Sequence, residues 1–359
     1  MSKTQYSPIY EFTRGTIVES IHFGSVAVVD VYGKLVAWYG DPKAVTFLRS
    51  TAKPFQALPF IQHGGQNVYH LSQREVALIC ASHSGTDEHV AVVQQIQMKT
   101  GVTEADLLCG VHTPSHEPTA EAMRERKEQP TPNRHNCSGK HTGMLAYTRM
   151  LDLSEHLDAG GLDYIDPQHP IQREILSTFA EMCDLLPDQV SKGIDGCSAP
   201  NFAVPLRNAA LAYARLCDPE TGGVSPTERA SACRTITSAM MANSDMVGGP
   251  GRFDTRLMEV GQGRIVAKGG AEGYQGVGLM PGALGPGSPA LGIALKISDG
   301  DLKSRARPAV TLEVLRQFGA LSSSELGLLS EFGPAAPVHN WRKIVVGRAR
   351  PSFELERGS

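Results

Sequence analysis

Alternation of apolar and polar positions near both ends of the chain predicts β-strands. Residues 25–30 and 34–39 alternate on either side of Tyr32-Gly33, a pattern typical of a β-hairpin. Apolar runs return late in the sequence, where we expect strands at 264–268, 291–297 and 343–347. Both ends of the chain are therefore expected to supply strands to one sheet.

Helical spacing dominates the region between these strands. Ser72 and Glu75 have the spacing of a capping box, and a helix at about 88–100 is expected to stop at Gly101. Further helices are expected at 144–151, 170–186, 225–242 and 308–318. We predict an α/β fold, with a mainly antiparallel sheet and flanking and inserted helices.

The order of these elements predicts one catalytic domain over residues 1–350. The helical region at roughly 55–250 is inserted between the strands, and residues 351–359 form a C-terminal tail. The chain has 359 residues of which 41% are hydrophobic, enough to bury a substantial core.

Charge and composition exclude several classes of partner. The net charge is −3 and no long basic run occurs, which argues against a nucleic-acid surface. We find neither a signal peptide in the first 25 residues nor 18 uninterrupted apolar residues, so we expect a cytoplasmic protein with no membrane association. The seven scattered cysteines suit reduced thiols better than a disulfide framework.

The strongest candidate site is the run from Asn136 to His141. It places an amide, a thiol, a hydroxyl, an amine and an imidazole around one glycine. A polar loop capping the following helix would explain the serine and the glycine. It would not explain the thiol, the amine and the imidazole together, so we interpret the run as functional.

A second candidate is the Ser50-x-x-Lys53 motif. On a helix the hydroxyl and the amine would share a face, so that a neutral lysine can take the proton of the serine. The motif is weak by itself, and Pro54 requires the helix to begin almost at Ser50. The alternative is an N-cap serine with a surface lysine.

The chain order of further motifs strengthens this interpretation. Ser82 lies in Cys80-Ala-Ser-His-Ser-Gly85, and Lys268 is followed by two glycines on a predicted late strand. This order resembles that of the active-site-serine enzymes that recognise penicillin, whose third motif is Lys-Thr-Gly. The glycine in place of threonine weakens the β-lactam hypothesis but keeps an amine where backbone can approach a ligand closely.

A metal site is also predicted from residue type. Cys137, His141 and Cys197, with Asp195 as a possible fourth ligand, would suit zinc, although paired C-x2-C motifs are missing. The alternative is that the thiols are buried and redox-inert.

Taken together, the motifs resemble the asparaginase II family, the class 3 or rhizobial-type L-asparaginases. The matching segments are Leu48-Arg-Ser-Thr-Ala-Lys-Pro54, Cys80-Ala-Ser-His-Ser84, Asn136-Cys-Ser-Gly-Lys-His141, Asp195-Gly-Cys197 and the lysine-glycine turn at Lys268. The match is ordered and extends from the first hairpin to about Gly347. It implies a fold similar to serine β-lactamases and glutaminases, a homodimer, and hydrolysis of L-asparagine to L-aspartate and ammonia.

The resemblance also implies roles for individual residues. The catalytic pairs are Ser50 with Lys53 and Ser82 with Lys268; zinc is held by Cys137, Lys140 and Cys197; and Arg49, His141 and Asp195 contact the substrate. Spacing alone would favour His141 over Lys140 as a zinc ligand, because a lysine amine must lose its proton to bind metal.

Three other functions share these residues. A β-lactamase or peptidase would use the same chemistry, but it is expected outside the cytoplasm. A glutaminase differs by one methylene of substrate, worth only ~1–3 kcal/mol in a pocket. A zinc-dependent asparagine-binding protein would show no turnover, and ammonia release distinguishes it from the enzyme.

Overall fold

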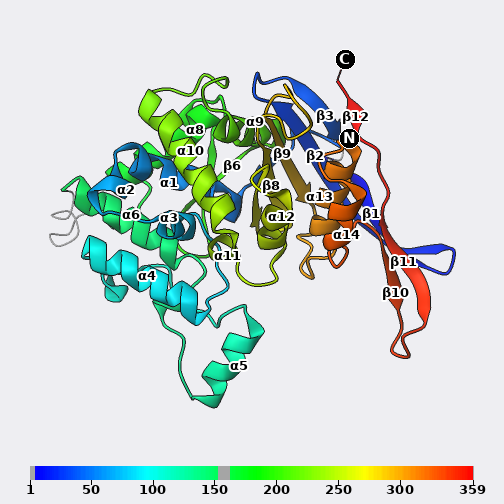
Figure 1. Cartoon of the computed structure of the whole chain (residues 1–359), viewed down its shortest axis with the longest axis horizontal. Coiled ribbons are helices and arrows are strands. Elements are labelled where there is room, and N and C mark those ends of the chain that lie inside the picture. The colour runs from blue at the N-terminus through cyan, green and yellow to red at the C-terminus, as the bar shows by residue number, and fades with distance from the viewer. Residues whose placement is uncertain (1–4, 153–161, 359) are drawn as a thin grey trace. The chain divides into compact units, whose positions relative to one another are not determined.

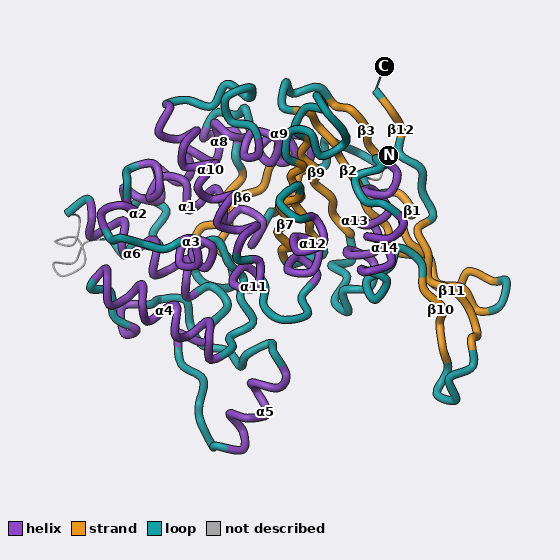
Figure 2. The backbone as a smooth tube through the Cα atoms, viewed as in Figure 1, coloured by secondary structure: helices purple, strands orange, loops and turns teal. Residues whose placement is uncertain are grey.

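The computed structural model describes residues 5–152 and 162–358, which fold as two compact units (Figure 1). Unit 1 comprises Met1–Thr51, Val204–Gly222 and Arg256–Ser359. Unit 2 comprises Ala52–Ala203 and Gly223–Thr255. Unit 1 contains the sheet and unit 2 contains most of the helices (Figure 2).

The described part of unit 1 forms a nine-stranded sheet that both ends of the chain supply. Its main path runs β10-β11-β1-β2-β9-β8-β7, and β3 pairs with β2 and β12. All the strand pairs for which a register is defined are antiparallel. The strands are β1 (Ser7–Arg14), β2 (Ile17–Asp30), β3 (Leu35–Tyr39), β7 (Ile265–Gly270), β8 (Tyr274–Leu279), β9 (Leu291–Ile297), β10 (Ala336–His339), β11 (Val345–Pro351) and β12 (Glu356–Arg357). The predicted fold class, a mainly antiparallel sheet with helices, is confirmed.

Helices pack on this sheet through close backbone contact. Helix α9 (Leu206–Cys217) contacts β2, β8 and β9, and α13 (Ala306–Gln317) contacts β1, β8, β9 and β11. A Cβ atom on Gly292 would lie 1.7 Å from the carbonyl oxygen of Ala210, so α9 can approach β9 only because this residue is glycine. The remaining elements of unit 1 are β4 (Val45–Phe47) and α14 (Ser323–Leu328), and α12 (Phe253–Gly261) runs across the boundary.

Unit 2 is built around α1 (Lys53–Gln62), which is buried along almost its whole length. It contacts α3 (Gln73–Ile79), α6 (Ser138–Met150), α8 (Pro170–Met182) and α10 (Thr227–Ala242). The other helices are α2 (Gly65–Val68), α4 (Asp87–Thr100), α5 (Glu117–Glu125) and α11 (Ser244–Val247). The antiparallel strands β5 (Ser191–Ile194) and β6 (Pro200–Pro205) form a hairpin whose last two residues belong to unit 1.

Several predicted elements are confirmed closely. The hairpin of β2 and β3 has the predicted turn, and β9 has the predicted bounds. The capping box at Ser72 forms, and α4 ends at Gly101, whose φ of 74° is the left-handed conformation that glycine allows. Cys183, Cys217 and Cys233 are buried, as expected for small core residues.

Other boundaries differ from the prediction for local reasons. Helix α8 stops at Met182 instead of residue 186, because Asp184 takes a left-handed φ of 57°. Lys343 has a φ of 64° and precedes β11, which begins at Val345. Helix α6 begins at Ser138 and not at Met144. The polar residues of its first two turns are buried, so the helix is not marked there by apolar residues.

No helix in the described ranges is both long enough and apolar enough to cross a bilayer.

Candidate active site

The Ser-x-x-Lys motif does not lie on one continuous α-helix. Arg49–Ala52 form a 3-10 turn, η1, and α1 begins at Lys53 with Pro54 in its first turn, where no backbone N–H is needed. Ser50 is partly exposed and belongs to unit 1, whereas Lys53 is 1% exposed and belongs to unit 2. The proline directly after the motif therefore fixes where the α-helix begins.

The amino group of Lys53 has several hydrogen-bond partners in unit 2, one of which is the thiol of Cys137. The amino group also donates to the hydroxyl of Ser82 at 2.9 Å, to the carbonyl oxygen of Asn136 at 3.4 Å and to the carbonyl oxygen of Ala81. Sequence motifs paired Lys53 with Ser50 and Ser82 with Lys268. The structure brings Lys53 and Ser82 together, a contact that motif order did not predict.

The glycine of the Asn136–His141 run explains how these acceptors converge. Ser82 follows the end of α3, and its N–H is held by the carbonyl oxygen of Val247 at 3.0 Å. A Cβ atom on Gly139 would lie 2.3 Å from the carbonyl oxygen of Leu78, so α6 lies directly against α3. Because of this close approach, a carbonyl oxygen just after α3 and another just before α6 can both accept hydrogen bonds from Lys53.

A second polar cluster forms where the start of α6 faces the turn between β5 and β6. Cys137 precedes the first residue of α6, and Lys140 lies on its first turn. Lys140 donates to the sulfur of Cys197 at 3.0 Å, and the thiols of Cys197 and Cys137 are hydrogen-bonded to each other. All three side chains are almost completely buried.

These buried groups shift one another's protonation. The hydrogen bond from Cys197 lowers the pKa of Cys137 well below its usual range, and the charges of Lys53 and Lys140 also favour this thiolate. The same hydrogen bond raises the pKa of Cys197, since its proton is shared with Cys137. Burial lowers the pKa of Lys140, but Cys197, Cys137 and Asp195 outweigh this effect and raise it.

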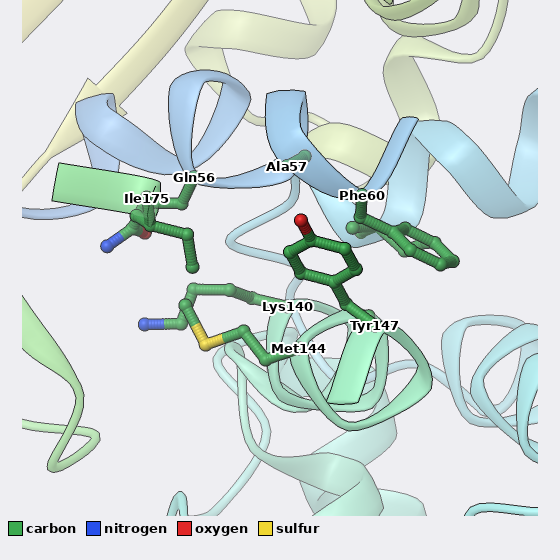
Figure 3. A pocket seen from close by; sticks show the side chains of 9 residues that line it. Gln56, Ala57, Phe60, Lys140, Met144, Tyr147 and Ile175 are labelled. Carbon is green, nitrogen blue, oxygen red and sulfur yellow. The ribbon is translucent and has the colours of Figure 1, made fainter. Parts of the chain in front are cut away.

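The stem of Lys140 is held in place by packing. It lines a cavity of about 10 Å³ together with Gln56, Met144 and Tyr147. Figure 3 shows these side chains around the lysine, which extends between α1 and α6. The stem thus lies beside a small void, and the amino group at its end is held by the hydrogen bond to Cys197.

The donor set of this cluster fits the predicted zinc in type. The sulfur of Cys197 is hydrogen-bonded both to the amine of Lys140 and to the thiol of Cys137, and thiolates are ligands that zinc prefers. In the described parts of the chain, no group of three or more His, Cys, Asp or Glu side chains is arranged to hold a metal. A zinc ion here would therefore need the amine of Lys140, in its neutral form, as a ligand.

The other predicted substrate residues lie in three separate elements. Asp195 lies in the turn before Cys197, where its carboxylate accepts the N–H of Gly196 at 2.8 Å. His141 is fully buried on the first turn of α6. Arg49 begins η1 in unit 1, with a positive φ of 51°.

Lys268 lies on β7, an edge strand of the sheet in unit 1, and is 1% exposed. Its amino group donates to the carbonyl oxygen of Gly269 at 2.8 Å. A Cβ atom on Gly270 would lie 2.6 Å from the carbonyl oxygen of Leu48, so β7 lies against the segment that leads into η1. The glycines after Lys268 thus allow close approach of another backbone segment of this unit, and close approach to a ligand stays a prediction.

Four histidines near Ser82 and Cys137 were missed by sequence reasoning. Each accepts a backbone N–H on one ring nitrogen: His83 from Gly85, His89 from Thr86, His112 from Asn136 and His135 from Cys137. The rings of His83 and His89 stack at 4.9 Å, and those of His112 and His135 lie at 4.3 Å. These hydrogen bonds fix the backbone near Ser82 and Cys137, and no local sequence pattern marks this role.

Burial keeps three of these imidazoles neutral. It lowers the pKa of His83 and of His89, and it lowers the pKa of His135 to about 4 with help from the charges of His112 and Lys53. A neutral ring is required because the nitrogen that accepts the backbone N–H must carry no proton.

A family model described as L-asparaginase II matches residues 10–351. The chain belongs to the L-asparaginase II family. Membership of this family identifies it as an amidohydrolase, in agreement with the resemblance drawn from its motifs. A search of curated proteins gives no match to the chain.

Solved structures with a similar arrangement include two glutaminases. A Bacillus subtilis glutaminase in covalent complex with 5-oxo-L-norleucine is 14% identical, with a TM-score of 0.38, covering 84% of this chain and 89% of that one. A Bacillus glutaminase in the presence of 4.3 M NaCl is 12% identical, with a TM-score of 0.37, covering 83% and 91% of the two chains.

Proposed function

We propose that this protein hydrolyses the side-chain amide of L-asparagine to give L-aspartate and ammonia. The observation that carries the proposal is the hydrogen bond between Lys53 and Ser82, in a chain of the L-asparaginase II family. A buried amine bonded to a serine hydroxyl can pass a proton along that bond, and amide hydrolysis needs such a proton for the leaving nitrogen.

The proposed reaction begins with attack by Ser50 on the amide carbon. Lys53, in its neutral form, takes the proton of the Ser50 hydroxyl, and backbone N–H groups stabilise the oxyanion that forms. The C–N bond then breaks, the nitrogen leaves as ammonia, and an ester remains on Ser50. Water hydrolyses this ester and releases L-aspartate.

Ser82 is proposed to carry the proton to the leaving nitrogen. The carbonyl oxygens of Ala81 and Asn136 can only accept hydrogen bonds from the Lys53 amino group, so neither can carry a proton onward. The hydroxyl of Ser82 also accepts from this amino group and can donate in turn, so the proton that Lys53 takes from Ser50 can pass on to Ser82. Lys268 is proposed to act with Ser82 in this step.

Substrate recognition is assigned by charge. Arg49 is proposed to pair with the α-carboxylate and Asp195 with the α-ammonium group, and His141 is proposed to contact the substrate from the first turn of α6. The Cys137, Lys140 and Cys197 side chains would hold zinc, which supplies a positive charge that positions the substrate. We further propose a homodimer, which light scattering of the purified protein tests.

A coupled ammonia assay tests the function directly. L-Asparagine, L-glutamine and a chromogenic β-lactam are compared, before and after chelation of metal, with the Ser50→Ala protein as the background. We expect ammonia from asparagine, little from glutamine, and no β-lactam cleavage. Binding of asparagine by calorimetry without ammonia release would replace the enzyme with a binding protein, and preferred release from glutamine would make it a glutaminase.

A further inference from the structure

The two ring nitrogens of His141 have different surroundings. Nδ1 lies 2.7 Å from the hydroxyl oxygen of Tyr164. Nε2 is buried and makes no hydrogen bond of standard geometry in the described residues, and the ring interacts with the sulfur of Cys197. In a neutral imidazole one nitrogen carries the proton and the other can only accept, so the partners of the two nitrogens decide which is which.

The surroundings of Tyr164 decide which nitrogen carries that proton. The backbone N–H of Leu108 donates to the tyrosine oxygen at 2.8 Å, and a backbone N–H can only donate. If the hydroxyl donates to Nδ1 of His141, the tyrosine has a partner for its proton and the ring proton lies on Nε2. In the opposite arrangement the tyrosine accepts twice, and its proton has no acceptor in the described ranges.

Tyr164 is 1% exposed, so bulk solvent does not reach its hydroxyl, and a buried hydroxyl proton without an acceptor is costly. The tyrosine is also held in place, because Gln172 donates to its carbonyl oxygen at 2.8 Å. The two rings meet nearly perpendicularly, with an interplanar angle of 85° and 5.6 Å between their centroids. These contacts together favour the direction in which the Tyr164 hydroxyl donates to Nδ1 of His141.

We propose that Tyr164 is a positioning residue that fixes His141 as the Nε2–H tautomer, making this histidine a hydrogen-bond donor toward the Cys197 side and not a metal ligand. A ring nitrogen that carries a proton has no lone pair for a metal. This accounts for a cluster in which Lys140, and not its neighbour His141, accompanies the two cysteines. The inference goes beyond the proposed function, because it concerns a proton position that exists with or without turnover.

Nitrogen NMR of the full chain labelled with ¹⁵N-histidine tests the tautomer directly. In the metal-free wild-type protein we expect a signal pair for His141 with a bare Nδ1 and a protonated Nε2, assigned by its loss in His141→Gln. A bare Nε2 in the wild-type protein overturns the proposal, and this measurement needs no variant of Tyr164.

Tyr164→Phe removes the donor and Tyr147→Phe provides a matched control. Tyr147 is a buried tyrosine on the helix that carries His141, and its hydroxyl donates to Glu174. We expect Tyr164→Phe to move the His141 signals toward the Nδ1–H tautomer and Tyr147→Phe to leave them unchanged. Unchanged His141 signals in a folded Tyr164→Phe protein also overturn the proposal.

Cobalt(II) absorption gives a second readout that does not depend on activity. Once Nε2 is bare, it becomes available as a nitrogen ligand. We expect the ligand-field bands of cobalt-loaded Tyr164→Phe to differ from those of the wild type and of Tyr147→Phe. Identical bands in all three proteins contradict the part of the proposal that concerns metal binding.

Discussion

Lys53 carries three protons when charged, and more than one kind of acceptor surrounds it. Two are backbone carbonyl oxygens, and the others are the hydroxyl of Ser82 and the thiol of Cys137. Because only the hydroxyl and the thiol can exchange a proton, the environment directs proton transfer by this lysine in unit 2 toward Ser82 and Cys137. Pairs of serine and lysine read from sequence spacing therefore need not be the pairs that exchange protons.

At the residue scale, the first prediction separates the two serines. Ser50→Ala should abolish ammonia release, because no ester can form, whereas Ser82→Ala should lower kcat by ~10²–10⁴ through loss of proton transfer. Steady-state kinetics checks this, and a diazoketone analogue of asparagine should label the peptide that contains Ser50. Labelling of the Ser82 peptide, with activity retained in Ser50→Ala, would reverse the roles.

A second prediction at this scale concerns the thiols. If zinc positions the substrate, Cys137→Ser and Cys197→Ser should each raise KM more than they lower kcat, and each should lower the zinc content. Metal analysis of the wild-type protein should give about one zinc per chain, with sulfur distances near ~2.3 Å by X-ray absorption. A collapse of kcat at unchanged KM would instead place the metal in the chemical step.

At the scale of elements, one glycine sets the distance between two helices. Gly139 lets α6 lie against the carbonyl oxygen of Leu78 at the end of α3, and both helix ends supply acceptors to Lys53. The glycine that made the Asn136–His141 run conspicuous thus has a packing role. The polar residues of this run depend on that packing for their positions.

Gly139→Ala is therefore predicted to damage both stability and activity. The added methyl group must push backbone apart, and overpacking of this kind costs ~1–3 kcal/mol of unfolding free energy. Gly327→Ala in α14 is the matched control, because its Cβ has no atom within 4 Å, so helix propensity should make it neutral or stabilising. Thermal unfolding and kcat/KM measure both effects. A Gly139→Ala protein with wild-type stability would show that α3 and α6 can separate without cost.

At the scale of the whole molecule, buried neutral histidines make stability depend on pH. Burial lowers the pKa of His83 and His89, and lowers that of His135 and His141 to about 4. Unfolding returns them toward the ordinary value near 6.5. The unfolded chain therefore binds more protons than the folded chain below that value.

Stability is accordingly predicted to be full above about pH 6.5 and to fall as the pH drops from 6.5 toward 4. Each additional proton bound by the unfolded chain contributes a slope of ~1.4 kcal/mol per pH unit. Urea unfolding at pH 7.5, 6.5 and 5.5 checks this, with proton uptake on unfolding as an independent measure. A midpoint that stays constant from pH 7.5 to 5.5 would contradict the assignment of these rings as neutral and buried.

Local patterns determined much of the fold. The β2–β3 hairpin, β9 and α4 could be predicted because their signals, a turn, a strand of apolar residues and a helix with both caps, lie within a few residues of one another. The motifs likewise determined the family, and the match of the L-asparaginase II family model to residues 10–351 confirms it. These features depend on residue type and short spacing, which the sequence states directly.

Contacts between distant segments were decided by tertiary structure alone. The contact of Lys53 with Ser82 joins residues 29 positions apart. The proton position proposed for His141 depends on Tyr164, which lies 23 positions away, and on the main-chain N–H of Leu108, which lies 56 positions from that tyrosine. Backbone carbonyl and N–H groups are identical at almost every position, so no sequence pattern marks the ones that orient a side chain. The sequence supplied the chemical groups, and the packing of α1, α3 and α6 determined which of them face one another.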